Sequence, residues 1–447
     1  MPHVVAVIGG ATAGAEVAGR LAERGAEVVV FEMNPRPYGK IEDGLPRWHE
    51  ALREKEYATI GEKLSRPGVH FVPNTKIGRD LDFEALTSEW GFSAVVLACG
   101  AWRDRPLPIE GAEAYLDKGL IYQNPFIIWF NHSEEAGYEG PVFEPQDGTL
   151  VVGGGLASID VAKVCMLETT RAKLAERGIE VGLLELEVKG IPKILAGHGL
   201  TYEELGLEGC TIFYRRRVED MPLMEAPEDA SPERLAKVAK GRERILAKAM
   251  DKYRFTLEPC SSPDGLLIED GKVVGLRLRR TKIENGRVVP LDETYERRGS
   301  CVISSIGSIP EPVPGIPMKG ELFAFTDWDA GRLADFPTVF SVGNIVTGKG
   351  NIVASRRHAR HVSEDTIERF LGLSDEGHDG EAALSEDSKA HLEPQLEKVT
   401  DFLACEPPLA PERVEAILSR VRERQAAVGY GGDYAAWLEK VAPAPAA

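Results

Sequence analysis

Short apolar runs rich in β-branched residues recur along the chain, and several of them end in small or polar turn residues. Such runs occupy residues 4–8, 27–31, 150–152 and 211–214. Short apolar runs bounded by turn residues are typical of the buried strands of a parallel sheet. Residues 15–23 and 159–167, which follow the first and third runs, show the pattern of helices. The alternation of strand and helix predicts an α/β protein built from βαβ units.

The first apolar run leads into a turn of small residues, with Gly9, Ala11, Ala13 and Gly14. A strand, a tight turn and a helix together present backbone N–H groups and a positive dipole end to a pyrophosphate. Ala11 stands where the strict G-x-G-x-x-G motif has its second glycine. The next strand delivers Glu32, about 20 residues further on, where a carboxylate can accept both ribose hydroxyls of an adenosine. This unit predicts a dinucleotide site; a plain βαβ unit with an incidental glutamate is the alternative.

A second turn of the same design follows the run at 150–152. It contains Gly153 and Gly155, and Ser158 takes the place of the third glycine, where a small side chain suffices for packing. After an excursion through residues 168–209, the next strand ends on three arginines, 215–217, instead of an acid. Guanidinium groups at this place suit the 2′-phosphate of NADPH, because they present a planar fork to phosphate oxygens. A solvated basic patch is the alternative interpretation.

Two dinucleotide turns in one chain predict a flavin that exchanges electrons with a nicotinamide. The runs at 92–100 and 302–307 end in small residues, as expected where the chain crosses between two nucleotide domains. A glycine-bracketed helix start within 343–352 offers N–H donors to a flavin. We therefore expect two Rossmann-like domains, with the NADPH domain inserted into a discontinuous FAD domain. The expected boundaries are 1–105 and 319–373 for FAD, 106–318 for NADPH, and 374–447 for a C-terminal helical extension.

Composition excludes several classes of function. A chain of 447 residues is long enough for two or three domains. Its net charge of −18 argues against nucleic acid as a partner. No apolar stretch approaches the roughly 20 residues of a membrane span. No signal segment precedes the first strand, so we expect a cytoplasmic protein.

Cysteines and histidines give no independent catalytic or metal site. The 6 cysteines include no C-x-x-C pair, so neither a local dithiol relay nor a compact iron–sulfur site is expected. Cys99, Cys165 and Cys301 lie in apolar stretches, where a small buried side chain is the usual role. His358 and His361 are surrounded by arginines, which disfavour a cation. We therefore expect no metal.

The order of these features resembles the adrenodoxin reductase family of ferredoxin-NADP reductases. The resemblance covers roughly residues 3–373 and is carried by the two turns, Glu32, residues 38–46, 98–100 and 126–131, Asp160, Arg215, Arg216, and residues 343–352. The stretch 215–225, with Met221 and Pro222, is also similar to the glutamate synthase small subunit. That subunit carries a cysteine-rich domain ahead of its flavin domain, whereas this chain starts at the flavin strand.

The resemblance implies FAD in the first domain, NADPH in the second, and single electrons leaving to a ferredoxin or another iron–sulfur partner. The flavin carries the hydride chemistry, so no catalytic side chain is implied. The residues implied for FAD are Gly9, Ala11, Ala13, Gly14, Glu32, Met33, Gly39, Lys40, Gly44, Cys99, Gly100, Gly343, Asn344, Gly350, Asn351 and Ile352. Those implied for NADPH are Gly153, Gly155, Leu156, Ala157, Ser158, Asp160, Arg215, Arg216 and Gly307. An electron-input subunit of a larger complex and a non-catalytic redox sensor remain alternatives.

Charged and amphipathic segments toward the C-terminal end bear on partners. Residues 374–393 are acidic and predict a linker. An amphipathic helix at 411–428 and a second short one with Tyr434 and Trp437 follow, and either pack on their own domain or dock on a partner subunit. The basic run 356–361 is a candidate docking surface for an acidic ferredoxin, with a solvated helix face as the alternative.

Overall fold

The computed structural model describes residues 2–226, 230–348, 350–373 and 407–443. Internal contacts separate the chain into two compact units. Unit 1 contains the residues up to Glu42, Glu50–Arg103, and the described residues from Ser308 onward. Unit 2 contains Asp43–His49 and Asp104–Gly307.

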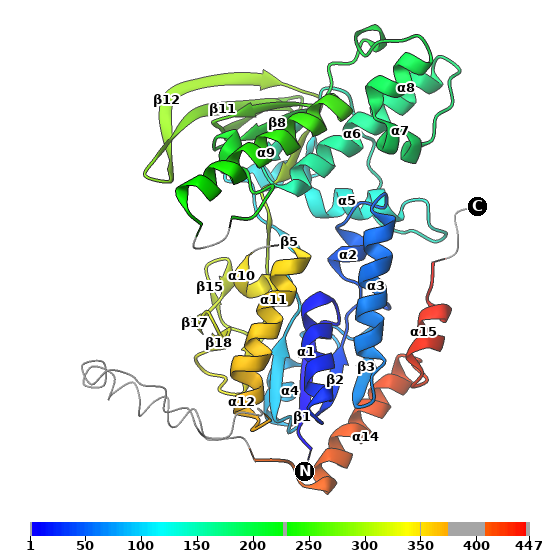
Figure 1. The fold of residues 1–447 in the computed structure, drawn as a ribbon, viewed down its shortest axis with the longest axis vertical. Helices are drawn as coiled ribbons and strands as arrows, with labels where there is room; N and C mark the ends of the chain where they lie inside the picture. The colour runs from blue at the N-terminus through cyan, green and yellow to red at the C-terminus, as the bar shows by residue number, and fades with distance from the viewer. Residues whose placement is uncertain (1, 227–229, 349, 374–406, 444–447) are drawn as a thin grey trace. The chain divides into compact units, whose positions relative to one another are not determined.

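Unit 1 is built on a parallel sheet of five strands in the order β19-β4-β1-β2-β3 (Figure 1). The strands are β1 Val4–Ile8, β2 Glu27–Phe31, β3 Val69–Val72, β4 Ala94–Leu97 and β19 Val339–Ser341. Alternate residues of each strand supply two cores. Val5 and Val7 face one core and Val4 and Ala6 the other, as the period of two in a strand requires.

Helices cover both faces of the unit 1 sheet. The first core includes residues of α1 Thr12–Glu23, α3 Glu50–Leu64, α11 Ile352–Val362 and α15 Tyr434–Lys440. The second includes residues of α4 Phe83–Ser88, α10 Asn344–Thr347 and α14 Pro411–Ala427. The remaining short elements are α2 Lys40–Asp43, α12 Glu368–Phe370, β5 Arg103–Asp104, β14 Ser308–Ile309, β15 Met318–Lys319, β16 Leu322–Phe323, β17 Phe325–Asp327 and β18 Arg332–Leu333.

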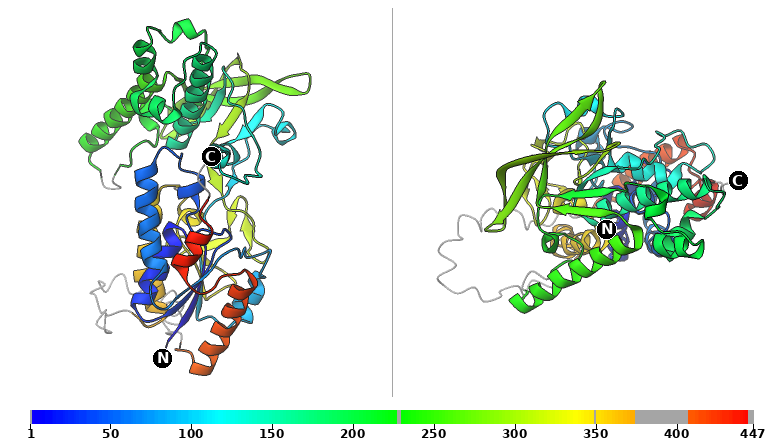
Figure 2. Two further views of the ribbon diagram at one scale, coloured as in Figure 1. Left: turned by 90° about the vertical axis from the view of Figure 1, so that its right-hand side faces the viewer. Right: turned by 90° about the horizontal axis from the view of Figure 1, so that it is seen from above.

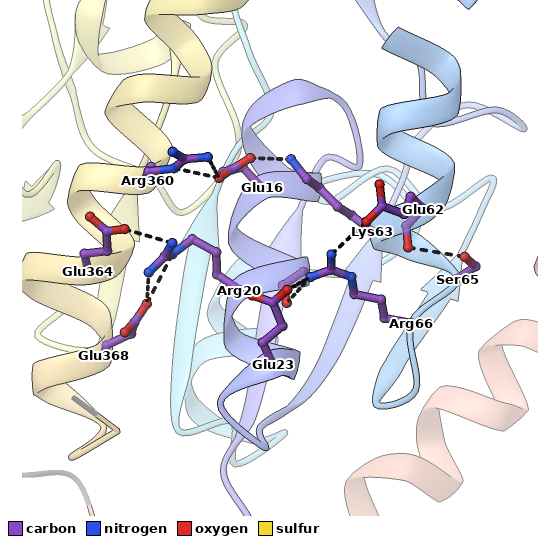
Figure 3. A network of polar contacts seen from close by, with 11 residues as sticks. Glu16, Arg20, Glu23, Glu62, Lys63, Ser65, Arg66, Arg360, Glu364 and Glu368 are labelled. Atoms are coloured by element: carbon purple, nitrogen blue, oxygen red, sulfur yellow. Dashed lines mark hydrogen bonds and ion pairs between the residues drawn. The ribbon is translucent and has the colours of Figure 1, made fainter. Parts of the chain in front are cut away.

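Ion pairs join α1 to α3 and α11 (Figure 3). The Glu16 carboxylate on α1 is 2% exposed and contacts both Lys63 and Arg360. Burial opposes ionisation of Glu16, but hydrogen bonds and charge from these two cations lower its pKa below the usual value. One turn along, Arg20 pairs with Glu364 at 2.8 Å and with Glu368 at 3.0 Å. The three helices are thereby held in one arrangement on the sheet.

Unit 2 has its own parallel five-stranded sheet, in the order β6-β13-β7-β8-β9. The strands are β6 Leu120–Tyr122, β7 Leu150–Gly153, β8 Thr211–Tyr214, β9 Thr256–Pro259 and β13 Val302–Ser305. The helices are α5 Gln123–His132, α6 Leu156–Ala175, α7 Leu183–Lys189, α8 Ile191–Gly197 and α9 Pro232–Tyr253. An antiparallel sheet follows, made of β10 Ser261–Glu269, β11 Lys272–Glu284 and β12 Arg287–Arg298 (Figure 2).

The α/β class is confirmed by the two parallel sheets. The helix expected at 159–167 is longer, because α6 starts at Leu156 and continues to Ala175, and the excursion after it contains α7 and α8. The sheet β10-β11-β12 was not expected. Its strands carry charged residues at exposed positions and bury mainly Val273, Leu276 and Leu278, so they lack the apolar runs of the other strands.

The two expected C-terminal helices are present as α14 and α15, and both pack on unit 1. On α14, Ile417 and Val421 are buried, and Val414 and Leu418 pack against the same core. This packing agrees with the first of the two alternatives for the helices. The expected linker at 374–393 lies outside the described residues. Within the described part of the chain, no helix is both long enough and apolar enough to cross a membrane.

Candidate functional site

Unit 1 contains a pocket at the carboxyl ends of its central strands. Its lining includes the ends of β1, β2 and β4. The lining residues are Ile8, Gly9, Ala11, Phe31, Glu32, Met33, Gly39, Thr75, Lys76, Ile77, Leu97, Ala98, Cys99, Gly100, Trp102, Glu311, Val313 and Ile316. Ligands of open parallel sheets bind at this edge. Seven of the residues expected to contact FAD are therefore brought together here.

The turn between β1 and α1 is too tight for side chains at two positions. A Cβ on Gly9 would lie 2.6 Å from the Ala98 carbonyl oxygen, and one on Gly14 would lie 1.8 Å from the Gly9 carbonyl oxygen. Ala11 is accommodated because it faces Gly39, where an added Cβ would come within 2.9 Å of the Ala11 Cβ. The alanine in place of the motif's second glycine is therefore matched by a glycine across the turn.

Glu32 is fixed at the pocket by the backbone of both neighbouring segments. Its side chain is buried, with 4% of the residue exposed. Oε2 accepts a hydrogen bond from the Gly10 N–H at 2.8 Å, and Oε1 accepts one from the Asn34 N–H at 3.0 Å. The carboxylate thus links the glycine turn to the segment after β2. This is the placement expected of a group that binds an adenosine ribose.

The segment 343–352 meets the N-terminal end of α1. A Cβ on Gly343 would come 2.8 Å from the Ala13 Cβ, and the Asn344 Oδ1 is buried and accepts no hydrogen bond from the described residues. Asn351 caps α11, because its Oδ1 accepts a hydrogen bond from the Ala354 N–H at 2.6 Å. A close backbone approach and an unsatisfied buried oxygen fit a ligand with hydrogen-bond donors beside the turn.

The remaining residues expected at FAD lie outside the pocket lining. Lys40 donates to the Ser308 Oγ at 2.9 Å, while Gly350 and Ile352 flank the start of α11. Gly44 lies in the segment Asp43–His49, which belongs to unit 2, and its contact with FAD stays a prediction. There, the Asn131 amide donates to the carbonyl oxygens of Asp43 and Leu45, each at 3.1 Å, so these contacts hold the segment against α5.

Several lining residues were missed by sequence reasoning. Thr75, Lys76 and Ile77 follow β3, where Asn74 adopts a left-handed conformation with φ 50°. Asparagine tolerates this conformation, so Pro73 followed by Asn74 was an available turn signal. Glu311, Val313 and Ile316 come from a proline-rich loop far along the chain, and nothing local indicates that they reach the pocket.

The second glycine turn, in unit 2, is as tight as the first. A Cβ on Gly153 would lie 2.3 Å from the Ser305 carbonyl oxygen, and one on Gly154 would lie 2.1 Å from the Tyr214 ring. The Ser158 Oγ donates to that same carbonyl oxygen at 3.1 Å. Ser158 therefore joins α6 to the end of β13 by a hydrogen bond, in addition to being small. Gly155 is the N-cap of α6, and Leu156 and Ala157 form its first turn.

The three arginines after β8 differ in their contacts. Arg215 is exposed, and its guanidinium makes no hydrogen bond or ion pair within the described residues, although its carbonyl oxygen accepts a hydrogen bond from the Thr281 Oγ1 at 2.9 Å. Arg216 donates to the Gly286 carbonyl oxygen at 3.0 Å, and Arg217 donates to Asp220 at 3.0 Å. The Arg217 hydrogen bond lowers the pKa of Asp220 below its usual value, so this pair stays charged. Arg215 is accordingly the guanidinium most available to a phosphate.

Asp160 and Gly307 complete the residues expected at NADPH. Asp160, on α6, lies 3.7 Å from the Lys163 Nζ and 3.9 Å from the His49 Nε2. Lys163 is buried against the rings of Trp48 and Tyr253 and also pairs with Glu187. Asp160 therefore belongs to an internal ionic cluster. Gly307 has φ 96° and nothing within 4 Å of an added Cβ.

Known oxidoreductases resemble this chain in sequence and in fold. The sequence profile of the pyridine nucleotide-disulphide oxidoreductases matches residues 3–190. The mitochondrial NADPH:adrenodoxin oxidoreductase of Arabidopsis thaliana is 26% identical over 439 residues, which cover 87% of each chain. The chain is thus similar to the pyridine nucleotide-disulphide oxidoreductases over residues 3–190, and to this relative over most of its length.

Two further comparisons show how much of the chain is similar to known proteins. The glutamate synthase small chain of Mycobacterium tuberculosis is 30% identical over 164 residues, 35% of this chain and 32% of its own. The structure of Mycobacterium tuberculosis FprA in complex with NADPH superposes with a TM-score of 0.63 at 21% identity, and 91% of each chain is covered. The superposition shows a shared fold over nearly the whole chain.

Five cysteines lie in the described part of the chain. Cys99, Cys165, Cys210, Cys260 and Cys301 are free thiols. Burial raises the pKa of Cys99, which lines the pocket, to about 12, so its thiol stays protonated at neutral pH. No group of three or more metal-binding side chains gathers among the described residues.

Proposed function

We propose that the chain is an FAD-dependent NADPH oxidoreductase that passes electrons to a ferredoxin-type iron–sulfur acceptor. The observation that carries the proposal is the pair of glycine turns: the next strand after the first is followed directly by Glu32, and the next strand after the second is followed directly by Arg215. Unit 1 would bind FAD and unit 2 NADPH, which places the NADPH domain inside a discontinuous FAD domain. The likeness to an NADPH:adrenodoxin oxidoreductase over 87% of each chain supports this activity.

The residues of unit 1 would hold FAD by its adenosine and pyrophosphate. Glu32 binds the ribose hydroxyls, and the turn from Gly9 to Gly14 brings the N-terminal end of α1 to the pyrophosphate. The orphan Asn344 Oδ1 can accept a hydrogen bond from the ring system. Bound FAD supplies the acceptor for a hydride and can release electrons singly.

The residues of unit 2 would orient NADPH. The first turn of α6, beginning at the Gly155 N-cap, faces the pyrophosphate, and Arg215 binds the 2′-phosphate as a charge-assisted pair. Ser158 keeps α6 against β13, which fixes the position of the helix end. A cytoplasmic location stays a prediction.

Steady-state reduction of a purified ferredoxin with NADPH as electron donor tests the acceptor. We expect NADPH-dependent ferredoxin reduction by the isolated chain. The 30% identity to the glutamate synthase small chain favours a second candidate, an electron-input subunit. That candidate predicts copurification with a cluster-bearing subunit from the native source and no reduction of free ferredoxin.

Replacing Glu32 with alanine should weaken FAD binding. The change removes a carboxylate from the ribose and leaves the Gly10 and Asn34 N–H groups without an acceptor in a buried place. Lost hydrogen bonds to charged groups cost about 1.5–3 kcal/mol. The FAD dissociation constant of the apoprotein, measured by flavin fluorescence quenching, should rise accordingly. Unchanged affinity would mean that the ribose lies elsewhere.

The basic run on α11 is less available for docking than its sequence indicated. Arg356 pairs with the buried Glu56 and Arg360 with the buried Glu16, whereas Arg357 is exposed and has no ion pair within the described residues. If α11 docks the acceptor, Arg357→Glu should slow ferredoxin reduction severalfold at low salt and flatten its salt dependence. NADPH-to-ferricyanide activity should persist.

The double variant Arg356→Glu/Arg360→Glu serves as the contrast. It removes the cationic partners of two buried carboxylates, Glu56 and Glu16, and places like charges beside them. We expect a lower thermal unfolding midpoint and parallel loss of both activities. Normal ferredoxin reduction by Arg357→Glu would exclude docking on this helix face.

A further inference from the structure

The C-terminal helices α14 and α15 contact the two loops on either side of Glu32. We call residues 33–38, after β2, loop A and residues 73–77, after β3, loop B. Glu32, directly before loop A, and Met33, its first residue, line the pocket, as do Thr75, Lys76 and Ile77 of loop B. Neither helix contributes a lining residue itself, so any effect on the pocket passes through these loops.

Arg424, on α14, holds loop B. Its Nε donates to the Thr75 Oγ1 at 2.9 Å and its Nη2 donates to the Asn74 carbonyl oxygen at 3.2 Å. Asn74 is in the left-handed region, with φ 50°. The Thr75 N–H in turn donates to the Glu32 carbonyl oxygen at 2.8 Å. Three residues thus form a continuous chain of hydrogen bonds from α14 to the glutamate at the pocket.

Residues Trp437 of α15 and Gln425 of α14 contact loop A and strand β3, which precedes loop B. The Trp437 Nε1, on α15, donates to the Pro35 carbonyl oxygen of loop A at 2.8 Å. The Gln425 Nε2 donates to the Phe71 carbonyl oxygen at 2.8 Å, on the outer edge of β3. The rings of Tyr430 and Tyr434 pack edge-on against Phe71. The helices therefore cover an otherwise open sheet edge and both loops together.

We propose that α14 and α15 set the geometry of the adenosine half of the FAD site, with Arg424 and Trp437 as positioning residues. The proposal rests on the assignment of the unit 1 pocket to FAD. Thr75 lines the pocket and its N–H donates a hydrogen bond to the Glu32 carbonyl oxygen. Displacement of loop B would therefore change both the pocket wall and the orientation of the Glu32 backbone. The C-terminal extension is then a functional part of the flavin site.

Arg420 offers a matched control for Arg424 on the same helix. It donates to the Glu89 carbonyl oxygen at 3.1 Å and lies over the Trp90 ring at 4.5 Å, and neither residue lines the pocket. Both arginines therefore tie α14 to unit 1, but only Arg424 contacts a lining loop. A general loss of helix docking would affect both variants, whereas a positioning role separates them.

The test compares the full-length variants Arg424→Ala, Arg420→Ala and Trp437→Phe. For each, FAD affinity of the apoprotein is measured by fluorescence quenching, and the unfolding midpoint is measured without FAD. We expect FAD affinity to fall about tenfold in Arg424→Ala and severalfold in Trp437→Phe, but to stay unchanged in Arg420→Ala. Apoprotein midpoints of Arg424→Ala and Arg420→Ala should be similar.

Equal FAD affinity in Arg424→Ala and Arg420→Ala would overturn the proposal. It would also be overturned if the loss of FAD affinity in each variant were proportional to the drop in its apoprotein unfolding midpoint. Trp437→Phe keeps an aromatic ring against Tyr430, so this variant is expected to fold even if Arg424→Ala does not. In that case, unchanged FAD affinity of Trp437→Phe would contradict the proposal. A wild-type chain that binds no FAD would instead reject the assignment of the pocket.

Discussion

Replacement of Gly14 with alanine should abolish FAD retention. The added Cβ would lie 1.8 Å from the Gly9 carbonyl oxygen, so the turn between β1 and α1 must open. Overpacking of this kind costs about 1–3 kcal/mol, and the opened turn also moves N–H donors away from the pyrophosphate. We expect FAD affinity to fall about 100-fold, which corresponds to about 2.8 kcal/mol. Flavin content after gel filtration and the FAD dissociation constant measure the change.

Gly61→Ala is the control for this prediction. Gly61 lies within α3 of the same unit, and the nearest atom to an added Cβ is 3.9 Å away, so FAD affinity should be unchanged. Alanine should also favour the helix slightly. Retention of FAD by Gly14→Ala at the wild-type level would show that the pyrophosphate does not lie on this turn.

Replacement of Arg215 and Arg216 together with alanine should remove the preference for NADPH. Charge-assisted hydrogen bonds contribute about 1.5–3 kcal/mol each, so kcat/KM for NADPH should fall about 100-fold. NADH has no 2′-phosphate, and its kcat/KM should hardly change. Because Arg216 is already bonded to the Gly286 carbonyl oxygen, Arg215→Ala alone should account for most of the loss.

Arg217→Ala is the control within the same run. Its guanidinium contacts Glu219 and Asp220, so the variant should keep the NADPH preference. Steady-state kinetics with both nucleotides separates the cases. Equal losses for NADPH and NADH in the double variant would exclude recognition of the phosphate by these residues.

The parts of the site that the sequence predicts are those fixed by local backbone geometry. Gly9 and Gly14 are required by a single tight turn, and Glu32 directly follows the next strand. One βαβ unit of the sequence is therefore enough to predict all three residues. Ser158 was predicted on the same basis, although its hydrogen bond to Ser305 joins elements far apart in sequence and was not foreseen.

The parts that were missed depend on long-range packing. Glu311, Val313 and Ile316 reach the pocket from a loop that carries no motif. The charges of Arg356 and Arg360 were visible in the sequence, but their buried partners Glu56 and Glu16 were not. A run of charged residues in a sequence shows which side chains a helix carries, but it does not show which other residues they contact in the fold.

Anaerobic titration of the purified protein with NADPH tests the central claim most directly. The account predicts FAD at one per chain and loss of the oxidised flavin absorbance band on addition of one equivalent of NADPH, with NADH much less effective. A chain that binds FAD but keeps the oxidised band in excess NADPH, or one that binds no flavin, would contradict it.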